Sequence, residues 1–187
     1  RIPVPSIQAS LINQWDGTAA NNRFAVTIDS VGRVCFDFQT TASSGSPNWS
    51  TNVYRHSCSL EKIPFASWNQ VAVTRNGTSV NYYINGNHAG TDTIEGSNLK
   101  TSTLPLRVAG QQRNGGYTID GQIDEVLFYT SALSANQLEL VYARGYNEVL
   151  VYNEIQPQHA PVPLLYFDMD AANYNQPSSN LLQTNYP

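Results

Sequence analysis

The acidic residues are the natural starting point for catalytic chemistry, because general acid/base hydrolysis needs two carboxylates on one face of an element. Asp124 and Glu125 are adjacent in an expected strand, so their side chains point to opposite faces and cannot act as a pair. Asp168 and Asp170 would share a face, but they belong to a tail with little regular pattern. The three histidines are each interpreted as isolated: His56, His88 and His159. Since the Gly-x-Ser-x-Gly nucleophile elbow is also missing, we expect that the protein is not an enzyme.

The two cysteines, Cys35 and Cys58, offer either a disulfide or two free thiols. Neither belongs to a Cys-x-x-Cys pair, so we expect no zinc site. Cys35 falls in the expected strand Arg33–Gln39, and Cys58 in the expected strand Asn52–Leu60. If these strands form a hairpin, the cysteines face each other and a disulfide is geometrically allowed. Two free thiols fit equally well, because cytosolic proteins also carry unpaired cysteines.

Outward-facing polar and aromatic side chains make the best candidate binding surface. If Val80, Tyr82 and Ile84 point inward, the alternate residues of that strand point outward. The candidate ligand-binding residues from this strand, an earlier strand and two loops are Asn81, Tyr83, Asn85, Arg33, Asp37, Trp49 and Tyr117. Sugars stack on aromatic rings and hydrogen-bond to such polar groups, although a solvated strand face or a subunit contact fits the same pattern. We assign Trp15 and Trp68 to the core, since they stand at strand starts in apolar registers.

These residues must be positioned by β-strands, which the alternation of apolar and polar residues predicts along most of the chain. The period of two is clearest in Phe24–Ile28 and Arg33–Phe38, on either side of a turn near Val31-Gly32. Further strands are expected at Leu11–Trp15, Asn52–Leu60, Val71–Arg75, Val80–Ile84, Leu106–Ala109 and Ile123–Tyr129. Asn76-Gly77 and Asn85-Gly86 predict tight hairpin turns, because both residues of such a turn must take a positive φ.

A single helix is expected at Ser134–Arg144. Ser134 is a favourable N-cap with Gln137 three residues later, which makes a capping box, and Gly145 is a typical stop. One short helix among many strands predicts an all-β fold, an antiparallel jelly-roll β-sandwich.

Several runs of sequence resemble the laminin G-like jelly rolls of the concanavalin A-like lectin/glucanase superfamily. The runs are Trp68–Thr74, Tyr82–Gly86, Gly121–Val126 and Ala132–Ser134, with weaker similarity at Leu11–Gly17 and Arg23–Phe38. The resemblance extends over roughly residues 9–145. The resemblance implies a concanavalin A-like sandwich, and a family that includes glycan binders, adhesion modules, virion or tail surface proteins and a separate branch of glycanases. The Glu-x-Asp-x-x-Glu arrangement of the glycanase branch does not occur here.

The resemblance also implies that a calcium site could be present, since sandwiches of this group hold Ca²⁺ at a loop end with carboxylate and carbonyl oxygens. The candidate calcium ligands are Asp16, Asp120 and Asp124, with Asn21 and Asn22 nearby in sequence. Their spacing is not that of an EF-hand, and Asp124 also suits a structural role in a neighbouring turn. The sequence predicts no definite cofactor, and it leaves open whether the protein binds Ca²⁺.

The composition favours a surface protein over a nucleic-acid-binding or membrane-spanning one. Charged residues make up only 13% of the chain, while there are eleven tyrosines and two lysines. A net charge of −4 without a stripe of Lys or Arg argues against nucleic acid. No apolar run reaches the roughly 20 residues of a membrane span. An extracellular, cell-surface or virion-surface location is expected.

The chain is expected to divide into an extended arm (1–10), the sandwich (11–145) and a tail (146–187). The tail segment Leu164–Asn173 resembles the opening strand of the same family, a strand that we do not expect at the N-terminus. It could fill the open sheet edge in its own chain or in a neighbouring copy. The alternative is the start of a further domain.

The sequence therefore predicts non-enzymatic carbohydrate binding or adhesion, with a glycan or glycoprotein surface as the partner. The leading alternative is a structural subunit of a virion, fibre or filament that contacts copies of itself through its arms. A glycan hydrolase is the least favoured class.

Overall fold

The computed structural model describes residues 9–15, 23–41, 52–94, 99, 101–110, 119, 121–143 and 165–167. The chain divides into two compact units, residues 1–121 and 122–187, and each is described by itself below. The described residues are mostly β, and every pair of neighbouring strands is antiparallel. Residues 146–164 lie outside the described ranges, so the predicted division at residue 145 stays a prediction.

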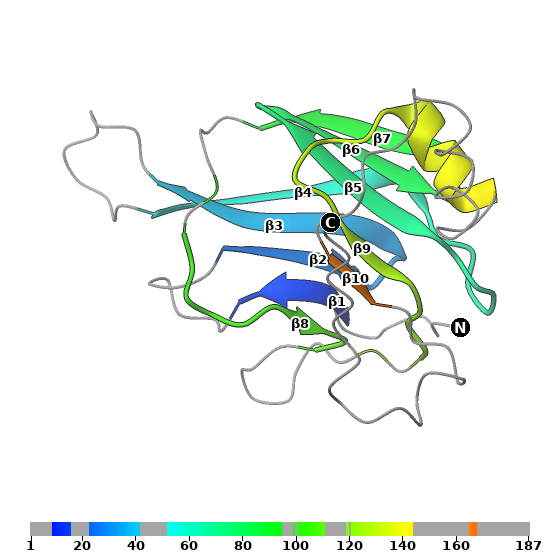
Figure 1. Cartoon of the computed structure of the whole chain (residues 1–187), viewed down its shortest axis with the longest axis horizontal. Coiled ribbons are helices and arrows are strands. Elements are labelled where there is room, and N and C mark those ends of the chain that lie inside the picture. Colours follow the sequence, from blue (N-terminus) through cyan, green and yellow to red (C-terminus); the bar gives the residue numbers. More distant parts are fainter. Residues whose placement is uncertain are drawn as a thin grey trace, which may run out of the picture. The chain divides into compact units, whose positions relative to one another are not determined.

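The first unit contains two antiparallel sheets (Figure 1). The larger sheet has the order β4-β3-β2-β1-β8, with bounds β1 (Ala9–Gln14), β2 (Phe24–Ile28), β3 (Arg33–Thr41), β4 (Asn52–Lys62) and β8 (Arg107–Val108). The smaller sheet has the order β5-β6-β7, with bounds β5 (Val71–Asn76), β6 (Ser79–Ile84) and β7 (Asn87–Thr93). All the strands predicted in this unit are present. β7 adds one within residues 86–103, where the sequence alone favours either a loop or an edge strand.

The core of the first unit lies between these sheets. On β3 the alternate residues Val34, Phe36 and Phe38 are buried, and the Phe36 and Phe38 rings lie 4.9 Å apart. The guanidinium of Arg75, on β5, stands 5.0 Å from the centre of the Phe38 ring. The phenol of Tyr82, on β6, hydrogen-bonds to the hydroxyl of Ser57 on β4. These contacts join the faces of the two sheets, so the predicted β-sandwich is confirmed.

Two hairpin turns connect the three strands of the smaller sheet. Asn85 and Gly86 have φ of 51° and 74°, as the sequence predicted for an Asn-Gly turn. The other turn differs by one residue from the prediction. Asn76 pairs with Ser79, so Gly77 and Thr78 are the central residues, and Gly77 alone takes a positive φ, of 59°. A glycine at the first central position is the requirement of a type II′ turn, which explains the shift.

The second unit consists of a short two-stranded sheet and a helix. β9 (Val126–Phe128) pairs with β10 (Leu165–Phe167), so part of the predicted tail strand 164–173 is paired within its own chain. Residues 135–143 are helical, and Leu127 packs against Val141. The capping box is present: the Gln137 backbone N–H donates to Ser134 Oγ at 3.3 Å, and Ser134 N–H donates to Gln137 Oε1 at 2.8 Å.

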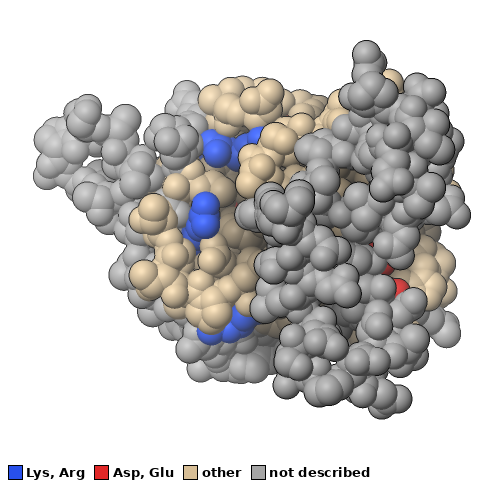
Figure 2. Space-filling view, viewed as in Figure 1, with Lys and Arg blue, Asp and Glu red and all other residues tan. Residues whose placement is uncertain are grey.

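The surface charges are scattered. On the described part of the face in Figure 2, Lys and Arg form separate groups among uncharged atoms rather than a continuous stripe. Within the described ranges, no helix has the length and apolar character needed to cross a bilayer.

Candidate functional site

Trp68 is the most exposed aromatic side chain described in the first unit, with 61% of its surface accessible. It lies in the loop 64–70 between β4 and β5, which corrects the prediction that it belongs to the core. Ala66 has a φ of 66°, so the chain turns two residues before Trp68. The extended register that would have directed the indole inward begins only at Val71.

The loop is held in shape by the carboxamide of Asn69. Its Nδ2 donates to the carbonyl oxygen of Pro64 at 2.6 Å and to that of Ser67 at 3.1 Å. These bonds close the backbone on both sides of the turn at Ala66. The indole of Trp68 is therefore carried on a loop fixed by side-chain hydrogen bonds.

Asn85 joins this loop to the neighbouring hairpin turn. Its Nδ2 donates to Asn69 Oδ1 at 3.0 Å, and its Oδ1 accepts from the Gln70 backbone N–H at 2.9 Å. The Asn85 backbone N–H also donates to the Gln70 carbonyl oxygen at 2.9 Å. The exposed Asn87 donates from Nδ2 to the Asn85 carbonyl oxygen at 3.0 Å.

We call this region the Trp68 surface, defined as Ser67, Trp68, Asn69, Asn85 and Asn87. It combines an exposed aromatic ring with carboxamide and hydroxyl groups at one end of the smaller sheet. Beside it, Gln70 Oε1 is buried with no hydrogen-bond partner among the described residues. An aromatic plane next to neutral hydrogen-bonding groups can take a ligand that has both an apolar face and hydroxyls.

The predicted ligand-binding residues of the smaller sheet have different outcomes. Asn85 belongs to the Trp68 surface, where its side chain holds the loop. Asn81 is half-buried, and its Oδ1 accepts a hydrogen bond from the Thr91 hydroxyl at 2.7 Å. Tyr83 was expected to face solvent, but it is buried, and its ring meets His88 edge-on at 5.5 Å. Tyr83 therefore offers no open face for stacking.

The predicted residues on β3 are engaged within the chain. Arg33 Nε lies 2.8 Å from Asp29 Oδ2. Burial raises the pKa of Asp29, but hydrogen bonds from Arg33 and Val31 and the Arg33 charge outweigh burial and lower the pKa below its usual value. Asp37 was expected to face solvent and is instead 6% exposed, because β3 is an interior strand buried on both faces.

The structure says little about the remaining residues predicted to bind a ligand or calcium. Trp49, Tyr117, Asp16 and Asp120 lie outside the described residues. Asp124 is exposed, and its Oδ1 accepts the Glu125 backbone N–H at 2.9 Å. The calcium site therefore stays a prediction.

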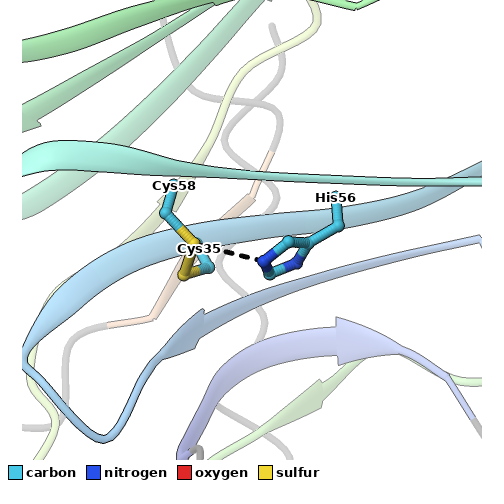
Figure 3. Close-up of side chains that lie close together, drawn as sticks. All are labelled: Cys35, His56 and Cys58. Atoms are coloured by element: carbon cyan, nitrogen blue, oxygen red, sulfur yellow. Dashed lines mark hydrogen bonds between the residues drawn. A yellow bond between two sulfur atoms is a disulfide. The ribbon is translucent and has the colours of Figure 1, made fainter.

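Cys35 and Cys58 are joined by a disulfide with an S–S distance of 2.00 Å. The two residues are directly opposite each other in the β3–β4 pairing. His56 lies beside them, with Nε2 3.3 Å from Cys58 Sγ (Figure 3). The other ring nitrogen, Nδ1, lies 2.6 Å from Asp37 Oδ1. The prediction of an isolated His56 is therefore wrong. The signal was the spacing His-x-Cys, which puts both side chains on one face of a strand.

The chain matches a known protein family. Residues 5–139 match the family described as the concanavalin A-like lectin/glucanases superfamily, which is well over half of the chain. No curated protein matches the chain.

The chain is also similar to solved structures, including the following two. The native heptameric SAP-like pentraxin from Limulus polyphemus has 21% identity and a TM-score of 0.51, over 75% of this chain and 65% of that chain. The S-layer domain-containing protein (residues 221–444) from Clostridium thermocellum ATCC 27405 has 20% identity and a TM-score of 0.32, over 74% of this chain and 64% of that chain. The chain thus spans just under two thirds of each structure. At these identities the pentraxin supports the fold alone, and the second structure carries no argument.

Proposed function

Because the chain belongs to the concanavalin A-like lectin/glucanases superfamily, we propose that it binds carbohydrate without hydrolysing it, through the Trp68 surface. The observation that carries the proposal is the 61% exposure of Trp68 on a loop fixed by Asn69 and Asn85. An indole has a large apolar face on which a sugar ring can stack, so its exposure beside polar groups supports a role in ligand binding.

The rigidity of the loop supports binding. An indole held in place before the ligand arrives loses little conformational freedom on binding, and such preorganisation favours affinity. The side chains of Asn69 and Asn85 are used to fix the loop, while the exposed Asn87 and Ser67 are placed to hydrogen-bond with sugar hydroxyls. The apolar face of a pyranose ring would lie on the indole.

The same residues argue against hydrolysis at this surface. Retaining and inverting glycosidases both need a pair of carboxyl groups at the scissile bond. The members of the Trp68 surface are an indole, a hydroxyl and three carboxamides, none of which titrates near neutral pH. We therefore expect bound oligosaccharides to be recovered intact after prolonged incubation with the protein.

The location that suits this function is outside the cytosol. The Cys35–Cys58 disulfide is the kind of cross-link that persists in oxidising compartments. A low content of charged residues and a polar, tyrosine-rich surface suit a domain that meets glycans or glycoproteins.

The proposal is tested by screening the full chain on an array of immobilised glycans and then repeating the screen with Trp68→Ala. We expect at least one class of glycan to be bound by the wild type and lost with the variant. Tyr142→Ala is the matched control, because Tyr142 is also half-exposed, at 50%, but lies on the helix of the second unit. Binding unchanged by Trp68→Ala, or lost equally with both variants, would rule out the Trp68 surface as the site.

One observation favours a second function, assembly with other copies of the chain. Within the described residues, β10 pairs with β9 through three residue pairs, Leu165–Phe128, Tyr166–Leu127 and Phe167–Val126. So short a pairing can be exchanged for the same pairing with a neighbouring copy at little cost in free energy. A structural subunit that uses its tail in this way is the alternative to an autonomous lectin.

A further inference from the structure

A cluster of potential metal ligands lies at the edge of the larger sheet, apart from the Trp68 surface. β4 is the edge strand and carries His56 and Cys58, while Cys35 is opposite on β3. The Sγ atoms of both cysteines and a ring nitrogen of His56 all lie within 4.8 Å of one another (Figure 3). Among the described residues this is the group of histidine, cysteine and acidic ligand atoms compact enough to share one ion.

Asp37 orients the imidazole toward the sulfurs. His56 Nδ1 lies 2.6 Å from Asp37 Oδ1, and in the tautomer in which Nδ1 donates to this carboxylate, Nε2 keeps a lone pair that a metal can take up. Nε2 is the nitrogen that faces Cys58 Sγ, at 3.3 Å. A carboxylate behind a histidine is the usual arrangement for a metal-ligating imidazole, because it fixes the tautomer and strengthens the ligand.

We propose that, when the Cys35–Cys58 disulfide is reduced, the two thiolates and His56 Nε2 bind a zinc ion. The reductant is a dithiol or a phosphine, which gives two electrons to the disulfide, while two protons complete two protein thiols. Zinc binding then releases those two protons as both thiols become thiolate ligands. The fourth zinc position stays with water, on the side of His56, whose side chain is 44% exposed.

The geometry requires only a small opening. Zinc–sulfur bonds of about 2.3 Å and zinc–nitrogen bonds of about 2.0–2.1 Å place tetrahedral S and N ligands roughly 3.6 Å apart. The Cys58 Sγ to His56 Nε2 distance is already 3.3 Å. After reduction the two sulfurs are no longer bonded to each other, and tetrahedral zinc would hold them about 3.8 Å apart. The backbone pairing of Cys35 with Cys58 is kept, so zinc would cross-link the same two strand positions as the disulfide.

The consequence is a cross-link between β3 and β4 that survives a change of redox environment. In oxidising surroundings the disulfide excludes the metal, because its sulfurs are bonded to each other. In reducing surroundings zinc replaces the disulfide at the same place. Stability added by zinc depends on its free concentration relative to its dissociation constant.

The test uses the full chain, reduced with a phosphine, freed of reductant without oxygen, and titrated with Co²⁺ as a spectroscopic substitute for Zn²⁺. We expect saturation at one Co²⁺ per chain, with thiolate-to-cobalt charge-transfer bands that Zn²⁺ abolishes. His56→Ala should weaken binding at least tenfold, and Asp37→Asn about 10–100-fold with the same stoichiometry. His88→Ala is the matched control, since His88 lies on β7, and it should bind as the wild type does.

Several results would overturn the proposal. Thiolate-to-cobalt bands in the oxidised protein would overturn it. A reduced protein in which added Co²⁺ gives no such bands, or bands that do not saturate, would do the same. Equal affinity in wild type and His56→Ala would also overturn it. If reduction unfolds the chain, near-ultraviolet circular dichroism decides: Zn²⁺ must restore the native signal in the wild type and restore it less in His56→Ala. No restoration in the wild type contradicts the proposal.

Discussion

Asn85 fixes both the backbone and the side chains of the Trp68 surface. Its φ of 51° lies in the left-handed region, which asparagine tolerates better than most residues. Its carboxamide bridges Gln70 N–H and Asn69 Oδ1 at 2.9 and 3.0 Å. A single side chain thus couples the hairpin turn to the loop that carries Trp68.

Two substitutions separate these roles. Asn85→Ala loses both side-chain hydrogen bonds and keeps the left-handed backbone, which costs a residue with a Cβ about 1–2 kcal/mol. Asn85→Gly loses the same bonds without the backbone cost. We expect Asn85→Ala to have the lower free energy of unfolding in urea, and both variants to bind glycan more weakly. Equal stability of the two variants would show that the backbone at this turn is not under strain.

Tyr82 makes stability depend on alkaline pH. Burial raises its pKa to about 12 from a usual value of 10.0, and the hydrogen bond with Ser57 offsets only part of that rise. The unfolded chain loses this proton near pH 10 and the folded chain near pH 12, so the contribution to stability is complete below pH 10 and is lost as pH rises toward 12.

Tyr82→Phe tests this dependence. At neutral pH the variant leaves the buried Ser57 hydroxyl without its partner and should lose about 1–3 kcal/mol of unfolding free energy. Between pH 10 and 12 its stability should fall less steeply than that of the wild type. Urea unfolding across this range measures both effects, and parallel pH profiles would contradict the assignment.

Residue chemistry alone could not separate buried from exposed positions on the polar faces. The alternation correctly placed Val34 and Phe36 on one face of the strand and Cys35 and Asp37 on the other. It could not show whether the second face is covered. Asp37 is buried beside Thr27 and His56, and Tyr83 is buried beside His88. Those partners come from other strands, so only the strand pairing reveals them. Trp68 escaped prediction for the opposite reason, since a turn at Ala66 moved it out of register.

At the scale of elements, the sequence predicted the strands well because apolar alternation and Asn-Gly turns are local signals. It predicted the helix through its capping box, which the structure contains. The sheet order is not local: β8 joins β1, and the smaller sheet packs on β3 and β4 through side chains such as Tyr82 and Arg75. Such long-range pairings follow from the resemblance to a known family and not from periodicity.

The two sheets approach closely where β7 passes β4, and this approach requires a glycine. A Cβ on Gly90 would lie 2.8 Å from the Leu60 backbone nitrogen, and Gly90 has a φ of 145°. We expect Gly90→Ala to lower the unfolding free energy by roughly 2–4 kcal/mol, because a backbone clash adds to the unfavourable φ.

Gly77→Ala is the matched control for this effect. Gly77 also has a positive φ, of 59°, but its Cβ would meet no atom within 4 Å. It should therefore lose only the backbone contribution, about 1–2 kcal/mol. Thermal unfolding of both variants makes the comparison, and equal losses would mean that the approach of β7 to β4 is not tight.

At the scale of the whole molecule, we predict that the protein binds its ligand as an autonomous domain. The first unit contains both sheets of the sandwich, the disulfide and the Trp68 surface. The tail contributes β10, which pairs within its own chain. Nothing in this arrangement requires a second copy for the Trp68 surface to be complete.

The molar mass in solution tests this claim. We expect light scattering to show a monomer in both cases, with 20.6 kDa for the full chain and a correspondingly smaller mass for the chain without residues 157–187. A larger particle that dissociates when the tail is removed would favour exchange of β10 between copies. Assembly would then replace glycan binding as the leading function.

The most direct test of the account is the affinity of one array-selected glycan, measured by calorimetry for wild type, Trp68→Ala and Tyr142→Ala. Losing the stacking surface of a large aromatic ring should cost about 1.5–3 kcal/mol, which weakens binding by roughly ten- to a hundredfold. We predict that weakening for Trp68→Ala, with Tyr142→Ala unchanged. Equal affinities for all three proteins would contradict the claim that the Trp68 surface binds carbohydrate.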